Sequence, residues 1–220
     1  MIIPRVKVCC ISSIDEARIA IECGASALGL VGKMPSGPGV ISDELISQIA
    51  KAVPPPISTF LLTSETRAEK IISHYKKVFT TTLQLVDELE TNEYALLRDQ
   101  LPWVKIVQVI HVIDKKSVEK AVEVSKYVDA ILLDSGNPNL SIKELGGTGR
   151  IHNWEISREI KESISTPLFL AGGLNKDNIR HAIETVQPFG VDLCSGVRTN
   201  GKLDKQKIKD FFYVIENESV

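Results

Sequence analysis

The chain has 220 residues, of which 43% are hydrophobic and 25% are charged, and this balance is typical of a globular domain rather than a disordered or fibrous protein. Its 26 Lys and Arg residues and 28 Asp and Glu residues leave a net charge of −2, which argues against a general nucleic-acid or membrane-surface binder. No apolar run matches a signal peptide or a spanning helix, so we expect a cytoplasmic enzyme with no nucleic-acid or membrane partner.

Short apolar runs alternate with helical patterns along the whole chain. The predicted strands lie at 5–10, 26–31, 57–62, 82–86, 104–112, 130–133, 167–171 and 191–194. The predicted helices follow them at 13–24 (with a Ser13 and Glu16 capping box), from Ser42, at 64–77, at 92–99, from Asp114, from Asn153, from Asn175 and over a last segment that carries Ile208, Phe211 and Ile215. Strands that alternate with helices in this way indicate a parallel sheet.

Eight such units in a chain of this length favour an α/β fold of the closed (β/α)8 barrel (TIM barrel) type, as a single domain over 1–220. An open, doubly wound sheet is the alternative. In a barrel, the chemistry belongs at the carboxyl ends of the strands. The four cysteines and four histidines show no spacing of metal ligands, so we expect no metal site and free, mostly buried thiols.

Two neighbouring loops carry the clearest sign of a ligand site. Gly172 and Gly173 follow the seventh predicted strand, and Ser195 and Gly196 follow the eighth. Glycines let the backbone approach an anion closely, and a helix that follows offers free N–H groups. Because barrels commonly hold phosphate at these two loops, we predict a phosphate site there. A tight structural turn is the alternative for either loop taken alone.

A third glycine-rich loop, 146–149, follows the sixth predicted strand and contains Gly147. It lacks the Gly-Lys-Ser/Thr ending of a nucleotide-binding P-loop. We predict that it forms a mobile cover over the site, with a flexible surface connection as the alternative.

Asp134 ends the sixth predicted strand, directly after the apolar run 131–133. A carboxyl group with apolar neighbours at a barrel mouth can have a raised pKa and serve as a proton donor. A helix cap or an ordinary loop aspartate is an equally good interpretation.

Cys9 lies at the end of the first predicted strand. Alternation along the strand places Lys7 and Cys9 on one face and Val6, Val8 and Cys10 on the other. The apolar face should pack under the helices, which leaves Cys9 towards the lumen. A thiol beside Lys7 and the phosphate loops could be partly ionised and act as a base, whereas an inert buried thiol is the alternative.

These strand ends resemble those of the phosphoribosylanthranilate isomerase family of tryptophan biosynthesis. The matching blocks, in order, are 7–12, 83–85, 132–135, 146–149 with Trp154, 170–174, and 190–192 with 195–197. Each single block is a weak signal, but together, in the right order and at predicted strand ends, they make a specific resemblance.

The resemblance implies a barrel enzyme that needs no metal or cofactor. Its reaction would be the Amadori rearrangement of N-(5′-phosphoribosyl)anthranilate, a small phosphorylated sugar compound, to 1-(o-carboxyphenylamino)-1-deoxyribulose 5-phosphate. Asp134 matches the general acid that protonates the ribose ring oxygen and opens the ring. Cys9 matches the general base that removes the C2′ proton from the resulting iminium.

Binding residues also carry over from the resemblance. The phosphate loops match at Gly172, Gly173, Ser195 and Gly196, and we expect further substrate contacts from Lys7, Asp192, Gly147 and Arg198.

The segment after the second predicted strand departs from the family pattern. The family usually has Ser-Pro-Arg there, with its Arg facing the anthranilate carboxylate, whereas 34–39 contains no Arg. Val86 and Asp87 stand where the family often has His-Gly, and Cys10 replaces a glycine. We hypothesise that Lys33 or Arg198 supplies the missing cation.

Two other functions stay open on the sequence. One is the related isomerase of histidine biosynthesis, which Cys9 in place of an Asp and the single pair of phosphate loops argue against. The other is a paralogue that acts on, or merely binds, another phosphorylated sugar, as the missing Arg suggests. The sequence does not determine the oligomeric state, and a homodimer is open.

Overall fold

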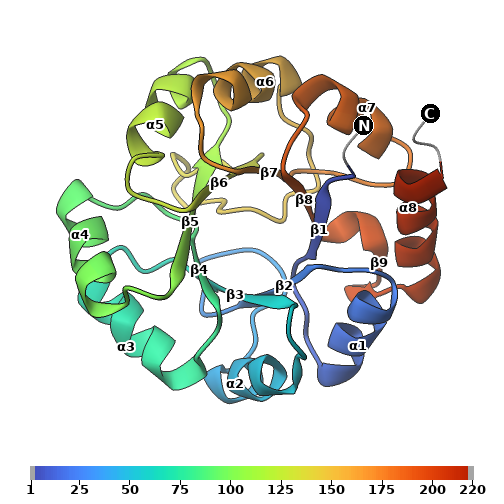
Figure 1. Cartoon of the computed structure of the whole chain (residues 1–220), viewed down its shortest axis with the longest axis horizontal. Coiled ribbons are helices and arrows are strands. Elements are labelled where there is room, and N and C mark those ends of the chain that lie inside the picture. Colours follow the sequence, from blue (N-terminus) through green and yellow to red (C-terminus); the bar gives the residue numbers. More distant parts are fainter. Residues whose placement is uncertain (1–2, 218–220) are drawn as a thin grey trace.

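The computed structural model describes residues 3–217, and over these residues eight parallel strands close into a barrel that is surrounded by helices (Figure 1). The strands are β1 (Arg5–Val8), β2 (Ala27–Val31), β3 (Ser58–Thr63), β4 (Thr82–Leu85), β5 (Lys105–His111), β6 (Ala130–Asp134), β7 (Leu168–Leu170) and β8 (Gly190–Leu193). β1 pairs with both β2 and β8, so the predicted (β/α)8 barrel is confirmed and the open sheet is excluded.

A helix covers the barrel after each strand. These are α1 (Ile14–Glu22), α2 (Asp43–Ala52), α3 (Ala68–Val78), α4 (Thr91–Gln100), α5 (Lys116–Val124), α6 (Trp154–Ser163), α7 (Ile179–Val186) and α8 (Lys205–Asn217). Between β8 and α8 lie a 3-10 helix, η1 (Ser195–Val197), and a small hairpin, β9 (Arg198–Thr199) and β10 (Lys202–Leu203).

The alternation of side chains along the strands separates two hydrophobic clusters. In β2, Leu28 and Leu30 point outward and join the larger cluster between the barrel and the helices. Ala27 and Val31 belong to a smaller cluster inside the barrel, together with Phe60 and Phe169. Such a filled interior is what a parallel barrel of this size needs, because its lumen is a packed core and not a pore.

Several predicted helix starts are confirmed in atomic detail. The Ser13 hydroxyl accepts from the Glu16 N–H at 3.1 Å, the Ser42 hydroxyl accepts from Leu45, and Asn153 accepts from the start of α6. Each side chain satisfies an N–H group that the helix itself leaves without a partner.

Asn175 differs from its predicted role as the cap of α7. Its side chain accepts from the Asp177 N–H, whereas α7 begins at Ile179 with Asn178 as the capping position. The predicted helix boundary is therefore early, because a separate turn lies between the glycine loop and the helix.

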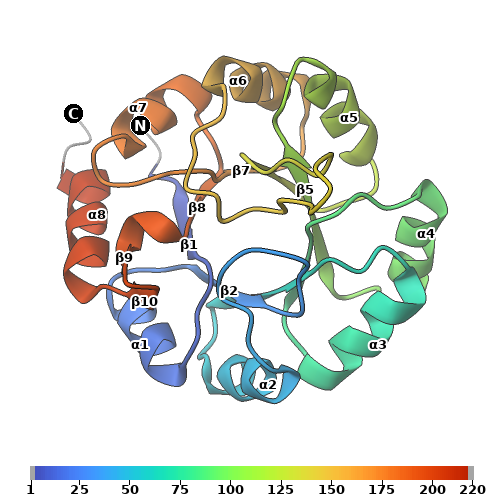
Figure 2. The same ribbon diagram turned by 180° about the vertical axis from the view of Figure 1, so that it is seen from behind.

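The loops at the carboxyl ends of the strands gather over one end of the barrel. Figure 2 shows the segment after β2 and the long segment after β6 running across this opening. The functional residues predicted from the sequence therefore fall on one face of the molecule. Within 3–217, none of the helices has the length and apolar character required to cross a membrane.

Candidate active site

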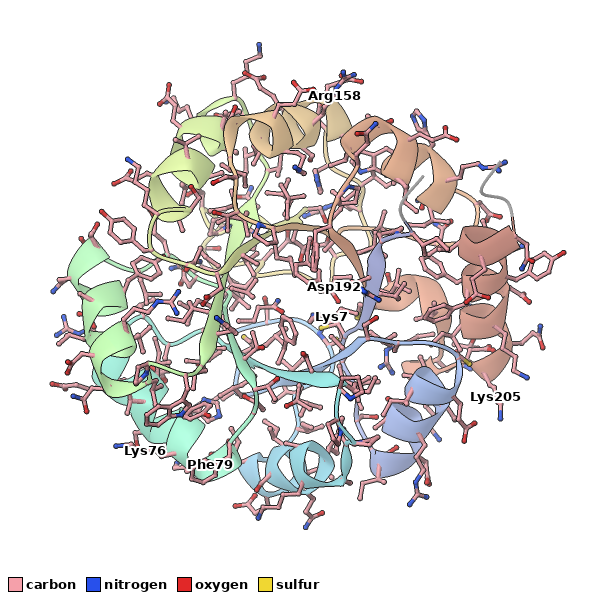
Figure 3. The ribbon with its side chains drawn as sticks, viewed as in Figure 1. Lys7, Lys76, Phe79, Arg158, Asp192 and Lys205 are labelled. Atoms are coloured by element: carbon pink, nitrogen blue, oxygen red, sulfur yellow. The ribbon has the colours of Figure 1, made fainter. Side chains whose placement is uncertain are left out.

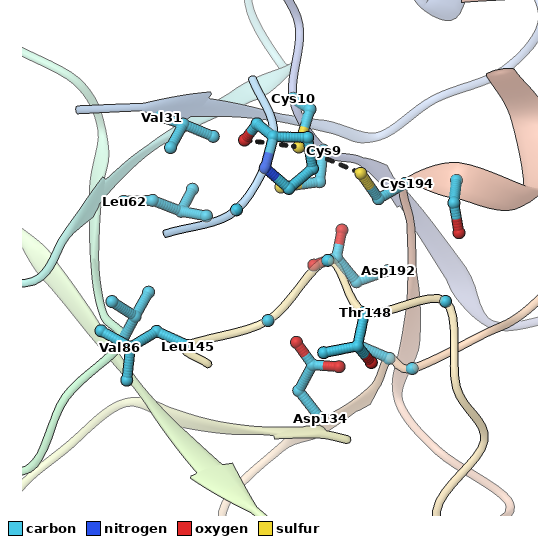
Figure 4. Close-up of a pocket in the computed structure, with 18 of the residues that line it drawn as sticks. Cys9, Cys10, Val31, Leu62, Val86, Asp134, Leu145, Thr148, Asp192 and Cys194 are labelled. Atoms are coloured by element: carbon cyan, nitrogen blue, oxygen red, sulfur yellow. Dashed lines mark hydrogen bonds between the residues drawn. The ribbon is translucent and has the colours of Figure 1, made fainter. Parts of the chain in front are cut away.

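A pocket opens at the carboxyl ends of the strands, where barrels of this kind hold their ligands. Its walls come from the ends of β1, β2, β3, β4, β6, β7 and β8 and from the loops that follow them. Cys9, Asp134 and Asp192 all line it. Figure 4 shows Cys9 on one side of the pocket and Asp134 on the other, with Asp192 between them.

Cys9 faces the lumen, as strand alternation predicts. Val6 and Val8 are packed in the outer cluster, whereas Cys9 belongs to the inner one and is 6% exposed. Gly29 of β2 makes room for the thiol, since a Cβ atom at that position would lie 2.8 Å from the Cys9 Sγ. The sulfur is therefore held between β1 and β2 with its open side towards the pocket.

Cys10 departs from the predicted alternation. We expected it to point towards the helices with Val6 and Val8, yet it lines the pocket. The strand ends at Val8, and the backbone then turns through a left-handed conformation at Cys10, where φ is 61°. Its thiol lies 3.0 Å from the Cys194 thiol and 3.6 Å from the Pro38 carbonyl (Figure 4), so it packs the end of β1 against two neighbouring loops.

Asp134 stands at the end of β6 with one carboxylate oxygen directed to the pocket. Its Oδ1 accepts from the Ser135 N–H at 2.7 Å. The other oxygen, Oδ2, has space because Gly146 carries no side chain; a Cβ there would lie 2.5 Å away. Burial raises the pKa of the Asp134 carboxyl, although the Ser135 N–H, His111 and Lys7 each pull it down in part. A raised pKa favours the protonated form of a carboxyl group, which is the form that can donate a proton.

Lys7 and Asp192 form a buried ion pair inside the barrel. The register of β1 and β8 places them opposite each other, and Lys7 Nζ donates to Asp192 Oδ2 at 2.7 Å (Figure 3). Burial by itself lowers the pKa of Lys7, but Asp192, Cys9 and Cys10 together outweigh it and keep that pKa above its ordinary value. The ammonium group therefore stays charged, close to the Cys9 thiol, and also lies over the Phe60 ring.

The second oxygen of Asp192 is free to bind a ligand. Oδ1 is buried and has no hydrogen-bond partner among the described residues, and Asp192 lines the pocket. An orphaned carboxylate oxygen costs free energy unless a ligand or water satisfies it, so a hydroxyl or ammonium group of a ligand fits this position.

The two predicted phosphate loops lie together. Gly172 and Gly173 adopt positive φ angles of 84° and 65°, which bring the turn after β7 close to the pocket. Gly196 touches this turn, because a Cβ there would lie 2.1 Å from the Leu174 carbonyl oxygen. Ser195 begins η1. Loops after the last two strands combined with a short extra helix make the usual anion site of such barrels.

The loop that carries Gly147 meets the loop after β2 above the pocket. The Ser36 hydroxyl donates to the Lys143 carbonyl at 2.5 Å. A Cβ on Gly147 would lie 2.6 Å from Pro38 Cδ. The two loops therefore close over the barrel opening by direct contact, which fits the covering role expected for 146–149.

The structure does not bring Arg198 or Lys33 into the pocket. Arg198 is buried on the outer side of β1, where it pairs with Glu16. Lys33 lies in a surface groove with Asp43 and Glu65. No Lys or Arg side chain is among the described residues that line the main pocket. The positions of both cations in loops at the mouth made them reasonable candidates, but Glu16 holds Arg198 behind β1 and Lys33 lines a separate surface groove.

Two residues that matter to the site were not predicted from the sequence: Gln84, which lines the pocket, and Gly29, which lies beside the Cys9 thiol. Gln84 projects from β4 into the pocket, and its Oε1 is buried without a partner among residues 3–217. Its polar side chain within the otherwise apolar run 83–85 was the available signal. Gly29 interrupts a fully buried strand, and a glycine in a strand interior commonly marks a close approach.

Comparison with known proteins gives a consistent result over nearly the whole chain. The family model for N-(5′-phosphoribosyl)anthranilate (PRA) isomerase matches residues 6–214. N-(5′-phosphoribosyl)anthranilate isomerase 2 of Methanosarcina mazei is 35% identical over 216 residues, which cover 97% of this chain and 95% of that protein.

Solved structures agree with the sequence relatives. A phosphoribosyl anthranilate isomerase in complex with reduced 1-(o-carboxyphenylamino)-1-deoxyribulose 5-phosphate superposes with a TM-score of 0.79 at 28% identity, covering 97% of this chain and 98% of that one. A monomer generated from the dimeric isomerase of Thermotoga maritima gives a TM-score of 0.76 at 26% identity, over 97% and 98% of the two chains.

Proposed function

Because the chain belongs to the N-(5′-phosphoribosyl)anthranilate isomerase family, we propose that its barrel mouth rearranges that substrate with Asp134 as general acid and Cys9 as general base. The protein is an isomerase of tryptophan biosynthesis that acts on a small phosphorylated compound. The observation that carries the two residue roles is that Cys9 and Asp134 line opposite sides of one pocket.

The reaction needs one group that starts protonated and one that starts deprotonated. Burial raises the pKa of Asp134, which favours the protonated form, and its Oδ2 is the atom assigned to give that proton to the ribose ring oxygen. Ring opening then leaves an iminium whose C2′ proton is acidic. The Cys9 sulfur, near the positive charge of Lys7, accepts the C2′ proton, and the enolamine that forms tautomerises to the ketone.

Anchoring of the phosphate sets the position of the sugar between the two groups. We assign the phosphate to the adjoining loops of Gly172, Gly173, Ser195 and Gly196, whose backbones are brought close to the pocket by their turns. Asp192 Oδ1 accepts a ribose hydroxyl, which satisfies an oxygen that is otherwise without a partner. Holding a substrate in this way lowers the entropic part of the barrier.

Complementation tests the activity against its rivals. The chain should restore growth without tryptophan to a strain that lacks this isomerase, and the Asp134→Asn variant, expressed at the same level, should not. A parallel strain that lacks the analogous histidine-pathway isomerase should stay auxotrophic. Growth in the histidine strain alone would favour the sister enzyme, and growth in neither strain would favour a non-catalytic sugar-phosphate binder.

The proposal also covers the oligomeric state of the protein and its location in the cell. We propose a cytoplasmic homodimer, supported by the dimeric state of the Thermotoga maritima relative. Light scattering of the purified protein at micromolar concentration should give twice the 24.2 kDa chain mass, and a single-chain mass would contradict the dimer.

A further inference from the structure

Arg198 holds a buried position directly behind the end of β1. It follows η1 as the first residue of β9 and is 9% exposed. One terminal nitrogen, Nη2, donates to the carbonyl oxygen of Cys9 at 3.1 Å and to that of Cys10 at 2.5 Å. The guanidinium group therefore binds the backbone of the two residues that form the thiol side of the pocket.

Glu16 fixes the guanidinium group in turn. Its carboxylate accepts from Arg198 Nη1 at 3.1 Å and also from the N–H groups of Ser12 and Leu203, both at 2.9 Å. Although burial raises the pKa of Glu16, these donors outweigh it and lower that pKa. The result is a buried ionic network that ties the β1–α1 loop to the β9–β10 hairpin. Of the guanidinium nitrogens, Nε is buried without a partner among the described residues.

The Cys9 backbone is consequently held on both sides. Its N–H donates to the Leu193 carbonyl of β8 at 2.7 Å, and its carbonyl accepts from Arg198. The adjoining Cys10 sits in a left-handed conformation, which is strained for a non-glycine residue. Without Arg198, two buried carbonyl groups would lose their charged donor at a turn that is already strained.

From these contacts we infer that Arg198 is a positioning residue for the Cys9 thiol. Its guanidinium group, held by the ion pair with Glu16, binds the Cys9 and Cys10 carbonyl oxygens and so fixes the direction of the thiol. This inference rests on the proposed role of Cys9 as the base. This positioning role differs from the substrate contact that we expected of Arg198. Both of its terminal nitrogens bind protein acceptors, and the residue does not line the pocket. A substrate carboxylate cannot reach it there.

Steady-state kinetics separate positioning from substrate binding. Arg198→Met should lower kcat for N-(5′-phosphoribosyl)anthranilate by about tenfold to a hundredfold, as expected for a small misplacement of a reacting group, while KM changes less than about threefold. Arg198→Lys should recover part of kcat, since one ammonium can reach the carbonyls but lacks the fork of the guanidinium.

Arg98→Met is the matched control. Arg98 also binds a carboxylate, Asp129 at 2.8 Å, and a backbone carbonyl, Tyr127 at 3.1 Å, but it lies away from the pocket. Its loss should leave kcat and KM unchanged. Equal losses of kcat in the two variants would show general destabilisation, and a raised KM with unchanged kcat in Arg198→Met would show substrate contact; either result overturns the inference.

Hydrogen exchange tests the clamp without reference to activity. The amides of 9–13 should exchange at least about tenfold faster in Arg198→Met, as expected when a local opening becomes easier, and at the wild-type rate in Arg98→Met. Unchanged exchange in Arg198→Met would overturn the clamp. If the wild-type protein itself shows no turnover, the proposed function fails while this exchange result still stands or falls by itself.

Discussion

At the scale of single residues, Asp134 shows how one environment can serve catalysis and oppose stability. The native pKa of this buried carboxyl is raised, so the unfolded chain releases the proton at a lower pH than the native protein does. Stability is therefore lost as the pH rises from the unfolded pKa, near 4, through the native one. The same raised pKa favours the acid form that the proposed mechanism requires.

Asp134→Asn should become progressively more stable than the wild type as the pH rises from 4 to 8. The wild-type side chain must then be buried as a carboxylate or keep its proton at a cost, whereas asparagine is neutral at every pH. We expect a difference of roughly 1 kcal/mol for each unit by which the native pKa is raised. Urea unfolding across this pH range measures it, with the exposed Asp177→Asn as control. A stability difference that does not vary with pH would contradict the assigned environment of Asp134.

Gly29→Ala tests the space that β2 leaves for the base. The new Cβ would lie 2.8 Å from the Cys9 Sγ and 3.0 Å from its Cα, so the thiol must shift. We expect kcat to fall by about tenfold or more, with KM nearly unchanged because the phosphate loops are not touched. Steady-state turnover measures both constants, and a wild-type kcat would show that the thiol position does not limit the reaction.

The two side chains proposed to react could be predicted from the sequence, but the residues that support them could not. Cys9 directly follows β1 and Asp134 ends β6, and strand ends are where a barrel places its chemistry. Arg198 and Glu16 are 182 residues apart, and no local pattern links them. The inward turn of Cys10 depends on the left-handed backbone conformation. A glycine at this position would have indicated such a conformation in the sequence, whereas a cysteine does not.

At the scale of elements, the loops after β2 and β6 act as a joint cover. They share the bond from Ser36 to Lys143 and the close approach of Gly147 to Pro38. The glycines of 146–149 predicted a cover, but the partner loop could not be identified, because contact between two loops from different strand ends depends on the closed barrel. Lids of this kind exclude water and commit the substrate.

Gly147→Ala should hold the two loops apart, since its Cβ would lie 2.6 Å from Pro38 Cδ. We expect KM to rise by about tenfold, equivalent to about 1.4 kcal/mol, with a smaller effect on kcat. Gly37→Ala is the control: it has a similar positive φ of 100°, but its Cβ would lie 3.6 Å from the nearest atom. Equal effects of the two substitutions on KM would show that backbone strain, and not loop contact, is responsible.

At the scale of the whole molecule, periodicity was sufficient to predict the architecture. Regular alternation of apolar runs and capped helices identified the strands that close the barrel. The pattern is regular because the apolar face of each helix packs on the strands beneath it. Boundaries were less well predicted, as at Asn175, because a turn and the first turn of a helix have similar local chemistry. The pairing of Lys7 with Asp192 depends on the register between the first and last strands, which only closure of the barrel creates.

The central claim is that Cys9 and Asp134 act on one substrate from opposite sides of one pocket. Loss of the fluorescence of N-(5′-phosphoribosyl)anthranilate measures turnover by the purified protein, and calorimetry with the reduced product analogue measures binding. We expect turnover by the wild type and a loss of about 10²–10⁴-fold in kcat in both Cys9→Ala and Asp134→Asn, with analogue affinity close to that of the wild type. Near-native turnover in either variant would contradict it.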